Sequence, residues 1–561
     1  MSSFMSLPPF RFDRARRPER ALALAALLIA LAWPGGVGAA DQPEVPDPRW
    51  SVFLITVDCM RPDHMSLYGY ERETTPRLAA FAEDAMVFGK AFTTTAWTSP
   101  GIVSLLTGYY PPVHGQNSRF SFYDTEMASA LRVLAAEGYD VYGSHVHGPT
   151  MANLGFQDSV DANVKKGQEP LESFASRRQP KDGPFFVWVH IKDTHLPYAP
   201  SEANANRWID TSRASQGVEA VRNWRVVLRP ENVDAPFSHP GKVVFTEDDV
   251  PVVRALYDGV MADVDERLGR VFDQLTQSGL MERTVIIISA DHGEELLEHG
   301  WVGHASTSYD AKLYEELTHV PLIIRLPDGS RAGRYDALVQ NVDVMPTVLD
   351  ILEIDQYRVS PAMQGRSLLP LASGAVDKVR DYVFAETTSK GWTTPKDELM
   401  PRLVSARSET HKLIRIPDGD GYRFEGYDLR ADPGELNNIY ESHKADFADL
   451  ERALADWAAQ NREVAAGLAQ DAAGRQAAKL AEALAQDDLL EAARKWEAIE
   501  VMHQTWGLEV DPFYRHEPYG SAWAALRRDA AETMATAMAC AAKGGRLQAT
   551  VGDGGAWRCA D

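Results

Sequence analysis

The sequence predicts an α/β protein built around a doubly wound, mostly parallel sheet. Three apolar runs rich in β-branched residues, at 50–57, 185–190 and 284–289, have the composition of buried strands. Helical periodicity lies between them, and in 257–279 the apolar residues recur every three or four positions. This alternation is typical of a sheet with helices on both faces, which binds ligands at the carboxyl ends of its strands.

The remaining elements follow from local signals along the chain. We expect helices at 76–88 and 100–107, the second ended by Gly108. After about Gly374 the pattern changes to short strands, and residues 446–502 are rich in Ala, Glu and Leu and read as helical. The expected strands there are 382–385, 412–415 and 426–429. We therefore expect a main domain at 48–375, a small sheet subdomain at 376–442, a helical extension at 443–510 and an irregular tail at 511–561.

Charge excludes one class of partner. The 561 residues carry 57 Lys and Arg against 80 Asp and Glu, a net charge of −23 at pH 7. Such a surface repels a phosphate backbone, and no basic run lies outside the N-terminus, so we expect no nucleic-acid partner.

Residues 1–40 resemble an export signal. Five arginines precede an apolar stretch at 21–33, and Pro34 and small residues up to Ala40 follow it. Thirteen apolar residues are fewer than the roughly 20 that span a bilayer. We expect a cleaved signal peptide and a periplasmic or secreted protein without a transmembrane segment; an uncleaved anchor is the alternative.

The three cysteines divide into a pair and a single residue. Export permits disulfides, and Cys540 and Cys559 lie together near the Gly-rich end of the chain, where they can pair. Cys59 is left over. We interpret it as a buried residue that takes no part in the chemistry; a role as a ligand or a reactive thiol is the alternative.

Acidic and histidine side chains follow each of the three strands. Asp58 ends the first, Asp193 and His195 follow the second, and Asp291 and His292 follow the third. Carboxylates at converging strand ends suit Mg²⁺, Ca²⁺ or Mn²⁺, and His292 shifts the preference toward Mn²⁺ or Zn²⁺. The alternative for 291–294 is a helix N-terminus with an acidic first turn.

A hydroxyl lies at a helix start. In the segment 97–108, Thr98 is near the N-cap and Pro100 is in the first turn. Unpaired amides and the helix dipole favour a bound anion or an alkoxide there. A divalent cation would lower the pKa of the hydroxyl further, whereas the plainer interpretation is an ordinary cap.

Taken together, these motifs resemble the sulfatase family of the alkaline phosphatase superfamily. The matching motifs occur in the same order over about residues 50–440. They are 57–64, 68–70, 74–76, 98–108, 111–115, 193–198, 291–294, 314–316 with 320–322, 343–347, 365–368, 427–429 and 432–435. The resemblance implies an α/β/α sandwich with a small C-terminal antiparallel sheet beside the site.

The resemblance also implies roles for individual residues. Asp58, Asp291 and His292 would bind the metal, and Thr98 occupies the nucleophile position and would also contact the ion. His195 and His304 would contact the substrate or protonate its leaving group. Asp193 is a further candidate ligand or substrate contact.

The departures from the family pattern concern the nucleophile. A working sulfatase carries Cys or Ser, converted to formylglycine within Cys/Ser-x-Pro-x-Arg, where this chain has Thr98 and Ile102. We therefore expect no formylglycine. Cys59 replaces the second of the usual paired aspartates. The usual Gly-Lys-Trp-His is not recognisable, and His145 or His147 stands nearby as a candidate anion contact.

These features predict an exported, metal-dependent hydrolase of phosphate, phosphonate or sulfate esters that acts through a covalent intermediate on Thr98. The substrate is a small-molecule, glycan or lipid ester. The set Asp58, Thr98, Asp291 and His292 resembles relatives with a threonine nucleophile, which favours phosphorus over sulfur. One alternative is a phosphoglycerol or phosphoethanolamine transferase, which normally carries membrane helices. The other is a catalytically silent binding protein.

Overall fold

The computed structural model describes most of the chain beyond residue 46. The described residues are 47–118, 129–143, 154–159, 170–212, 215–223, 245–305, 311–360, 362–394, 402–419, 421–486, 488–489, 491–496, 519–542, 546–549 and 557–560. The chain divides into two units, Met1–Pro46 and Asp47–Asp561, and the fold below is that of the second unit. The expected signal peptide therefore lies outside the described residues, as do His145 and His147.

The expected mostly parallel sheet is confirmed. Within the described residues it has nine strands, in the order β10-β2-β9-β6-β1-β5-β3-β4, with β11 beside β2. Only β9 runs antiparallel to its neighbours β2 and β6 among the described pairings. The strands are β1 (Ser51–Val57), β2 (Met86–Phe92), β3 (Asp140–Gly143), β4 (Asp158–Ser159), β5 (Phe185–Ile191), β6 (Thr284–Ala290), β9 (His319–Arg325), β10 (Gly333–Tyr335) and β11 (Val339–Gln340).

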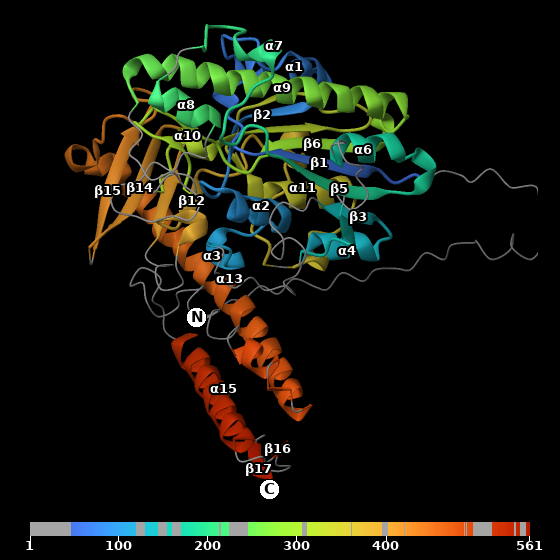
Figure 1. The fold of residues 1–561 in the computed structure, drawn as a ribbon, viewed down its shortest axis with the longest axis vertical. Helices are drawn as coiled ribbons and strands as arrows, with labels where there is room; N and C mark the ends of the chain where they lie inside the picture. Colours follow the sequence, from blue (N-terminus) through green and yellow to red (C-terminus); the bar gives the residue numbers. More distant parts are fainter. Residues whose placement is uncertain are drawn as a thin grey trace, which may run out of the picture. The chain divides into compact units, whose positions relative to one another are not determined.

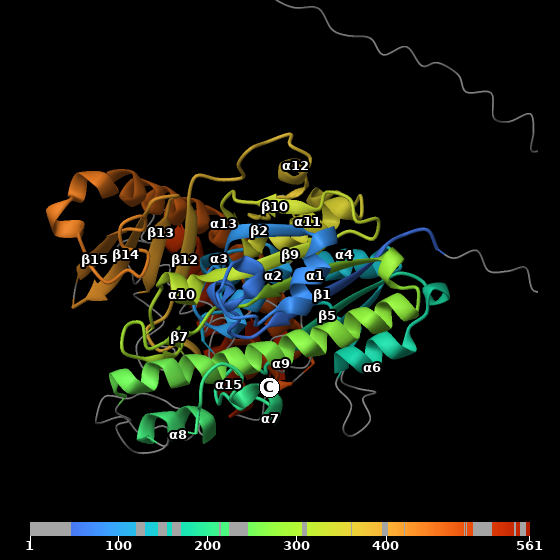
Figure 2. The same ribbon diagram turned by 90° about the horizontal axis from the view of Figure 1, so that it is seen from above.

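Helices cover both faces of this sheet (Figures 1 and 2). One face carries α1 (Pro76–Phe81), α6 (Pro170–Arg177) and the long α9 (Val250–Gln277); the other carries α2 (Thr98–Thr107), α4 (Ala130–Ala136) and α11 (Val344–Ile351). Successive residues of β1 alternate between the two cores, with Leu54 in one and Ile55 in the other. A strand buried on both faces needs apolar residues at every position, which explains the continuous apolar runs in the sequence.

A second sheet follows the main one, as expected. The strands β12 (Val383–Thr387), β13 (Leu403–Arg407), β14 (His411–Asp418) and β15 (Gly421–Asp428) pair antiparallel in that order. The first turns of helix α13 (Lys444–Ala485) pack against this sheet through Phe447, Leu450, Leu454 and Trp457. The same apolar cluster includes Tyr110 of the main domain, so α13 contacts both parts.

Two local expectations were wrong. Helix α1 ends at Phe81 rather than Phe88, because the apolar run that follows it forms β2 and pairs with β9, a partner more than 200 residues later. The tail is not irregular: it contains helix α15 (Tyr519–Ala541) and the hairpin of β16 (Arg546–Ala549) and β17 (Trp557–Ala560). Alanine, the best helix former, recurs throughout α15, which packs against the end of α13.

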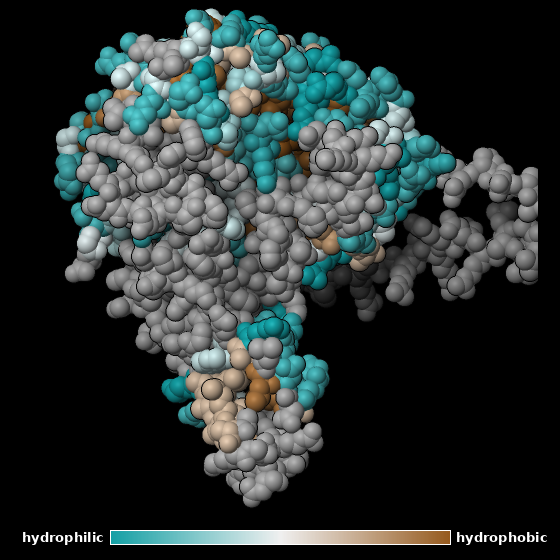
Figure 3. All heavy atoms as spheres, in the orientation of Figure 1, coloured by the Kyte–Doolittle hydropathy of each residue, from teal (hydrophilic) through white to brown (hydrophobic). Residues whose placement is uncertain are grey.

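The described surface is largely hydrophilic, and two of the three cysteines differ in their bonding. Hydrophilic side chains cover much of the described surface in Figure 3, and apolar ones gather over α15, where Met538 is 65% exposed. No helix of the described residues combines the length and apolar character needed to cross a bilayer. Cys540 is disulfide-bonded and Cys59 is a buried free thiol; the side chain of Cys559 lies outside the described part.

Candidate active site

Two aspartates meet where β1 and β6 end. The strands are parallel and Val57 pairs with Ala290, so Asp58 and Asp291 leave the sheet side by side. His292 follows directly, and its ring points back at both carboxylates. Its Nε2 lies 3.5 Å from Oδ1 of Asp58 and 3.4 Å from Oδ2 of Asp291. The structure thus brings together the three expected metal ligands, all of them buried.

The other nitrogen of His292 fixes its tautomer. Nδ1 lies 2.7 Å from the carbonyl oxygen of Gly293, an acceptor, so Nδ1 carries the proton and donates it there. This leaves Nε2 with its lone pair facing the two carboxylates, which is the usual arrangement of a metal-binding histidine. Residues 291–294 do not begin a helix, because Gly293 and Glu294 donate backbone hydrogen bonds to Leu317 and Glu316. The alternative of a helix N-terminus is therefore wrong.

Thr98 lies next to this cluster. It is the first residue of α2, and Trp97 is the N-cap of that helix. Its Oγ1 lies 3.3 Å from Nε2 of His292, and the side chain is 6% exposed. Gly101 permits this approach, since a Cβ there would lie 2.5 Å from the carbonyl oxygen of Asp291. The hydroxyl therefore combines the positive end of a helix with two nearby carboxylates that can hold a cation.

A further histidine joins the cluster that the sequence did not single out. His190 of β5 pairs in register with Thr56 of β1, and its Nε2 lies 3.4 Å from Oδ2 of Asp58 and 3.9 Å from Oδ2 of Asp291. Its Nδ1 lies 2.8 Å from the hydroxyl of Thr56, which orients the ring. The available signal was a lone polar residue near the end of an otherwise apolar strand, beside a strand that ends in Asp58.

The electrostatics of the cluster fit a divalent cation. Burial opposes ionisation of Asp58, but His195, His190 and His292 hold its pKa well below the usual value. Burial and the charge of Asp58 raise the pKa of Asp291, and burial lowers that of His292, which favours the neutral ring. Among the described residues, Oδ2 of Asp291 and Nε2 of His190 have no hydrogen-bond partner. Buried polar groups are normally paired with a hydrogen-bond partner, and buried charges pair or coordinate metals, so these residues fit a metal.

A second pair of histidines, His195 and His304, lies beside this cluster. Nδ1 of His304 lies 2.6 Å from Oε2 of Glu294, whose Oε1 accepts a hydrogen bond of 2.8 Å from Tyr198. Burial raises the pKa of Glu294, but His304 outweighs it and the pKa is lowered, so the carboxylate holds the ring. The ring centroid of His304 lies 4.3 Å from that of His292 and 5.1 Å from that of His195. The sequence pattern did not indicate that Glu294 would orient the ring of His304.

Asp193 is not brought into this cluster. Its side chain is 47% exposed, and Oδ2 accepts a hydrogen bond of 3.0 Å from Arg267 of α9. Thr194 is the residue of this segment that reaches inward, because its hydroxyl donates to the backbone carbonyl of Asp58.

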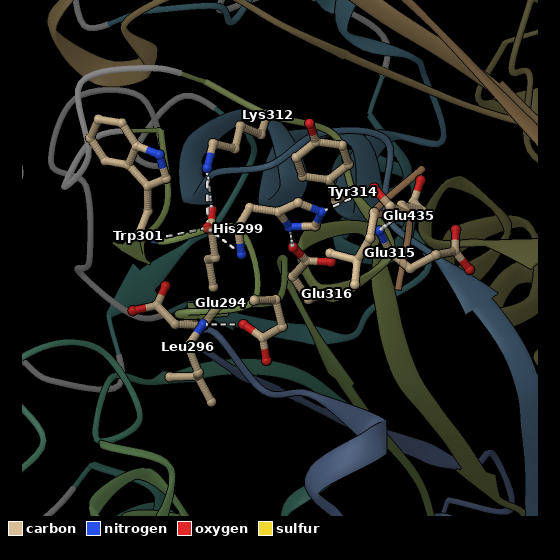
Figure 4. A network of polar contacts seen from close by, with 12 residues as sticks. Glu294, Leu296, His299, Trp301, Lys312, Tyr314, Glu315, Glu316 and Glu435 are labelled. Carbon is tan, nitrogen blue, oxygen red and sulfur yellow. Dashed lines mark hydrogen bonds and ion pairs between the residues drawn. The ribbon is translucent and has the colours of Figure 1, made fainter. Parts of the chain in front are cut away.

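A polar network anchors the chain between His292 and His304 (Figure 4). His299 stacks on Tyr314, with ring centroids 3.8 Å apart, and its Nδ1 lies 2.7 Å from Oε1 of Glu316. Glu295 also lies close to this pair, but its carboxylate is 2.9 Å from Nζ of Lys312. Since an ammonium already compensates this group, we assign it a structural role rather than a metal.

The same network reaches the second sheet. Nζ of Lys412, on β14, lies 3.2 Å from Oε1 of Glu315 and 3.1 Å from Oε1 of Glu435. Glu315 and Glu316 begin the short helix α10 (Glu315–Thr318), so the ion pair between Lys412 and Glu315 connects the C-terminal sheet to the segment beside the site.

Comparison with known proteins gives a consistent result. The family profile described as Sulfatase matches residues 51–354, and the profile N-sulphoglucosamine sulphohydrolase, C-terminal, matches 298–462. The N-acetylglucosamine-6-O-sulfatase of Bacteroides thetaiotaomicron is 33% identical over 536 residues, covering 81% of this chain and 92% of the relative. Arylsulfatase K of Gallus gallus is 28% identical over 268 residues, which span 46% of this chain and about half, 48%, of that protein.

Solved structures show the same fold at low identity. The phosphonate monoester hydrolase of Agrobacterium radiobacter has a TM-score of 0.58 at 22% identity, covering 74% of this chain and 96% of that one. A structure in complex with its substrate D-glucosamine-2-N,6-O-disulfate has a TM-score of 0.55 at 21% identity, with 74% and 98% covered. Members of this family generally use a divalent metal. The chain belongs to the sulfatase family.

Proposed function

We propose that this protein is a metal-dependent ester hydrolase in which Thr98 is the nucleophile. The observation that carries the proposal is the position of the Thr98 hydroxyl, 3.3 Å from Nε2 of His292 at the start of α2. Asp58, Asp291, His292 and Thr98 would hold the ion, with His190 beside them. A bound divalent cation would supply Lewis-acid activation of the hydroxyl and of the ester oxygens.

The protein supplies the rest of the reaction. The hydroxyl of Thr98 releases its proton to water, its oxygen attacks the central atom of the ester, the bond to the leaving oxygen breaks, and a covalent ester of Thr98 forms. His304, held by Glu294, or the neighbouring His195 gives a proton to the leaving oxygen. Water then attacks the covalent ester and the bond to the Thr98 oxygen breaks. The same histidines take up a proton of the attacking water, and the Thr98 oxygen takes a proton from solvent to restore its hydroxyl.

Phosphate and phosphonate esters fit this chemistry best. Formylglycine requires Cys or Ser, and Thr98 is neither. A sulfate on formylglycine leaves by breaking a C–O bond, whereas a sulfate on threonine would need a second attack at sulfur. A phosphoryl group on threonine can be removed by in-line attack of water at phosphorus, with the same histidines assisting.

A sulfate ester of a glycan is the second candidate. It is supported by the identity of 33% with an N-acetylglucosamine-6-O-sulfatase over 92% of that relative. In that case the same Thr98 would carry the sulfuryl group, and turnover of phosphorus esters would be absent.

The test is a panel of substrates with matched variants. Wild type, Thr98→Ala and Thr98→Ser would be assayed with p-nitrophenyl phosphate, bis-p-nitrophenyl phosphate, p-nitrophenyl phenylphosphonate and p-nitrophenyl sulfate. We expect turnover of a phosphorus ester, at least a ~10³-fold lower kcat in Thr98→Ala, and partial activity in Thr98→Ser. Full activity of Thr98→Ala would refute the nucleophile, and bound metal without turnover of any ester would favour a silent binding protein.

We further propose that residues 1–40 direct export and that the domains divide at about 375, 442 and 510. The arginine-rich start, the apolar stretch and the small residues before Asp41 support the signal. N-terminal sequencing of the protein recovered from a bacterial periplasm should begin close to residue 41; an intact Met1 would contradict cleavage.

A further inference from the structure

Cys59 has a backbone conformation that turns its side chain into the site. It follows Asp58 directly, is fully buried, and has a φ of 59°. Residues other than glycine adopt this left-handed region at a cost, and Asn and Asp do so most easily. The thiol lies 3.1 Å from Oδ1 of Asp58 and 3.6 Å from Nδ1 of His304.

The thiol is part of a second group of donors that adjoins the first. Sγ of Cys59 and ring nitrogens of His292 and His304 lie within 4.8 Å of one another. His292 belongs to both groups, so the thiol faces the same space as the carboxylates. One sulfur and two or more imidazole nitrogens therefore accompany the two carboxylates.

Two further polar atoms point to a ligand in this space. Oδ2 of Asp291 and Nε2 of His190 are both buried and have no hydrogen-bond partner among the described residues. Nε2 of His190 faces Asp58, the residue whose Oδ1 accepts from the Cys59 thiol. A cation here would contact oxygen, nitrogen and sulfur donors together.

We propose that Cys59 is a metal ligand, and that it makes this site select a borderline-soft ion such as Zn²⁺ over Ca²⁺ or Mg²⁺. Calcium takes six to eight oxygen ligands, whereas zinc accepts thiolate, imidazole and carboxylate in a set of about four. On binding, the S–H proton is released to water and a sulfur–metal bond forms, with no change of oxidation state. The inference rests on the proposed function only in placing an ion at Asp58, Asp291 and His292.

The first test uses Co²⁺ as a spectroscopic substitute for Zn²⁺. The full chain is stripped with a chelator and titrated with Co²⁺. Wild type should show a near-ultraviolet sulfur-to-cobalt charge-transfer band together with visible ligand-field bands. Cys59→Ser should lose the first and keep the second. The double variant Cys540→Ser/Cys559→Ser is the matched control, and it should keep the charge-transfer band because Cys540 is disulfide-bonded.

The second test measures selectivity without any turnover. Wild type and Cys59→Asp are dialysed against equal Zn²⁺ and Ca²⁺, and bound metal is measured by mass spectrometry. Asp tolerates the positive φ, so this variant should remain folded, with a bound Zn²⁺:Ca²⁺ ratio at least ~10-fold lower.

The outcomes separate this inference from the proposed function. Wild type without the charge-transfer band, or a metal ratio unchanged in Cys59→Asp, would overturn the role of Cys59 even if the ester hydrolysis is found. A thiolate-bound ion in a protein that hydrolyses no tested ester would support Cys59 and contradict the enzyme mechanism.

Discussion

At the scale of single residues, His304 is the proposed proton donor to the leaving oxygen, and its position is tightly fixed by its neighbours. Glu294 holds Nδ1 of His304 and is itself held by Tyr198, so the ring has one orientation. A group that acts by protonating the leaving oxygen matters most when that oxygen is strongly basic.

We therefore expect His304→Gln to lower kcat by about 10²- to 10³-fold for alkyl esters and by much less for p-nitrophenyl esters. Comparison of kcat across leaving groups of increasing pKa gives the measurement, with His195→Gln as the matched variant. An equal loss for all leaving groups in His304→Gln would assign the proton to another group.

Strand ends could be predicted at this scale, but packing across the sheet could not. Asp58, Asp291 and His292 follow runs that are recognisable as strands, and the parallel register places them together. His190 and Glu294 depend on which strand or segment lies opposite, and that is fixed by contacts more than 90 residues apart. Asp193 also follows a strand, yet its side chain turns outward to Arg267, which the sequence pattern does not encode.

At the scale of elements, the approach of α2 to the end of β6 determines where Thr98 lies. A Cβ on residue 101 would lie 2.5 Å from the carbonyl oxygen of Asp291, so Gly101→Ala must displace the helix. We expect a loss of about 1–3 kcal/mol in the free energy of unfolding, and a kcat/KM at least ~10-fold lower because Thr98 moves with the helix.

The matched control is Gly467→Ala on α13, where an added Cβ meets nothing within 4 Å. It should stabilise the protein by about 0.5–1 kcal/mol and leave kcat/KM unchanged. Denaturant unfolding and steady-state kinetics on both variants check this, and wild-type kinetics in Gly101→Ala would show that α2 tolerates the displacement.

The same helix is supported by a buried histidine with a pH-dependent contribution. His114 lies 3.0 Å from the hydroxyl of Ser104 on α2, and burial lowers its pKa to about 3 from 6.5. Between these values the unfolded chain binds the proton and the folded chain does not. This contribution is therefore complete above pH 6.5 and is lost as the pH falls toward 3, at about 1.4 kcal/mol per pH unit.

In His114→Gln, the free energy of unfolding should fall less steeply between pH 6.5 and 4 than in wild type. The difference in slope should be about 1.4 kcal/mol per pH unit, whatever the variant's stability at pH 7. His443→Gln, at an exposed histidine, should leave the slope as in wild type. Equal slopes in wild type and His114→Gln would mean that the ring is already protonated in the folded state.

Among the elements, the strands buried on both faces and the long helix could be predicted because their patterns are continuous. The strand β2 could not, since its apolar run suits a helix until β9 pairs with it. Helix α15 could have been predicted from its alanine content. It was missed because the sequence on either side of it has no helical pattern.

At the scale of the whole molecule, α13 contributes to a first apolar cluster at its start and a second at its end, while Ala465 between them belongs to the main-domain core. Its first turns join the C-terminal sheet and Tyr110 of the main domain, while Leu480 and Leu484 near its end pack with α15. The described members of the second cluster include no residue of the main domain. The mostly parallel sheet and the C-terminal sheet were predicted correctly, whereas this division of α13 depends on contacts that a single sequence does not reveal.

We expect a chain ending at Gln486 to fold and to keep the kcat of the full protein. In contrast, Trp457→Ala should lower the free energy of unfolding by about 3–5 kcal/mol, since it empties space in the first cluster. Thermal unfolding and ester turnover of both proteins provide the check. Loss of activity in the shortened chain would assign the last segment a role in the site.

The central claim, that Thr98 carries the covalent intermediate, is tested most directly by peptide mass spectrometry of the protein quenched in acid during turnover of a phosphorus ester. The account predicts the added mass of one phosphoryl or phosphonyl group on the peptide containing Thr98, localised to that residue and absent from Thr98→Ala. Steady turnover with unmodified Thr98, or the group on another side chain, would contradict it.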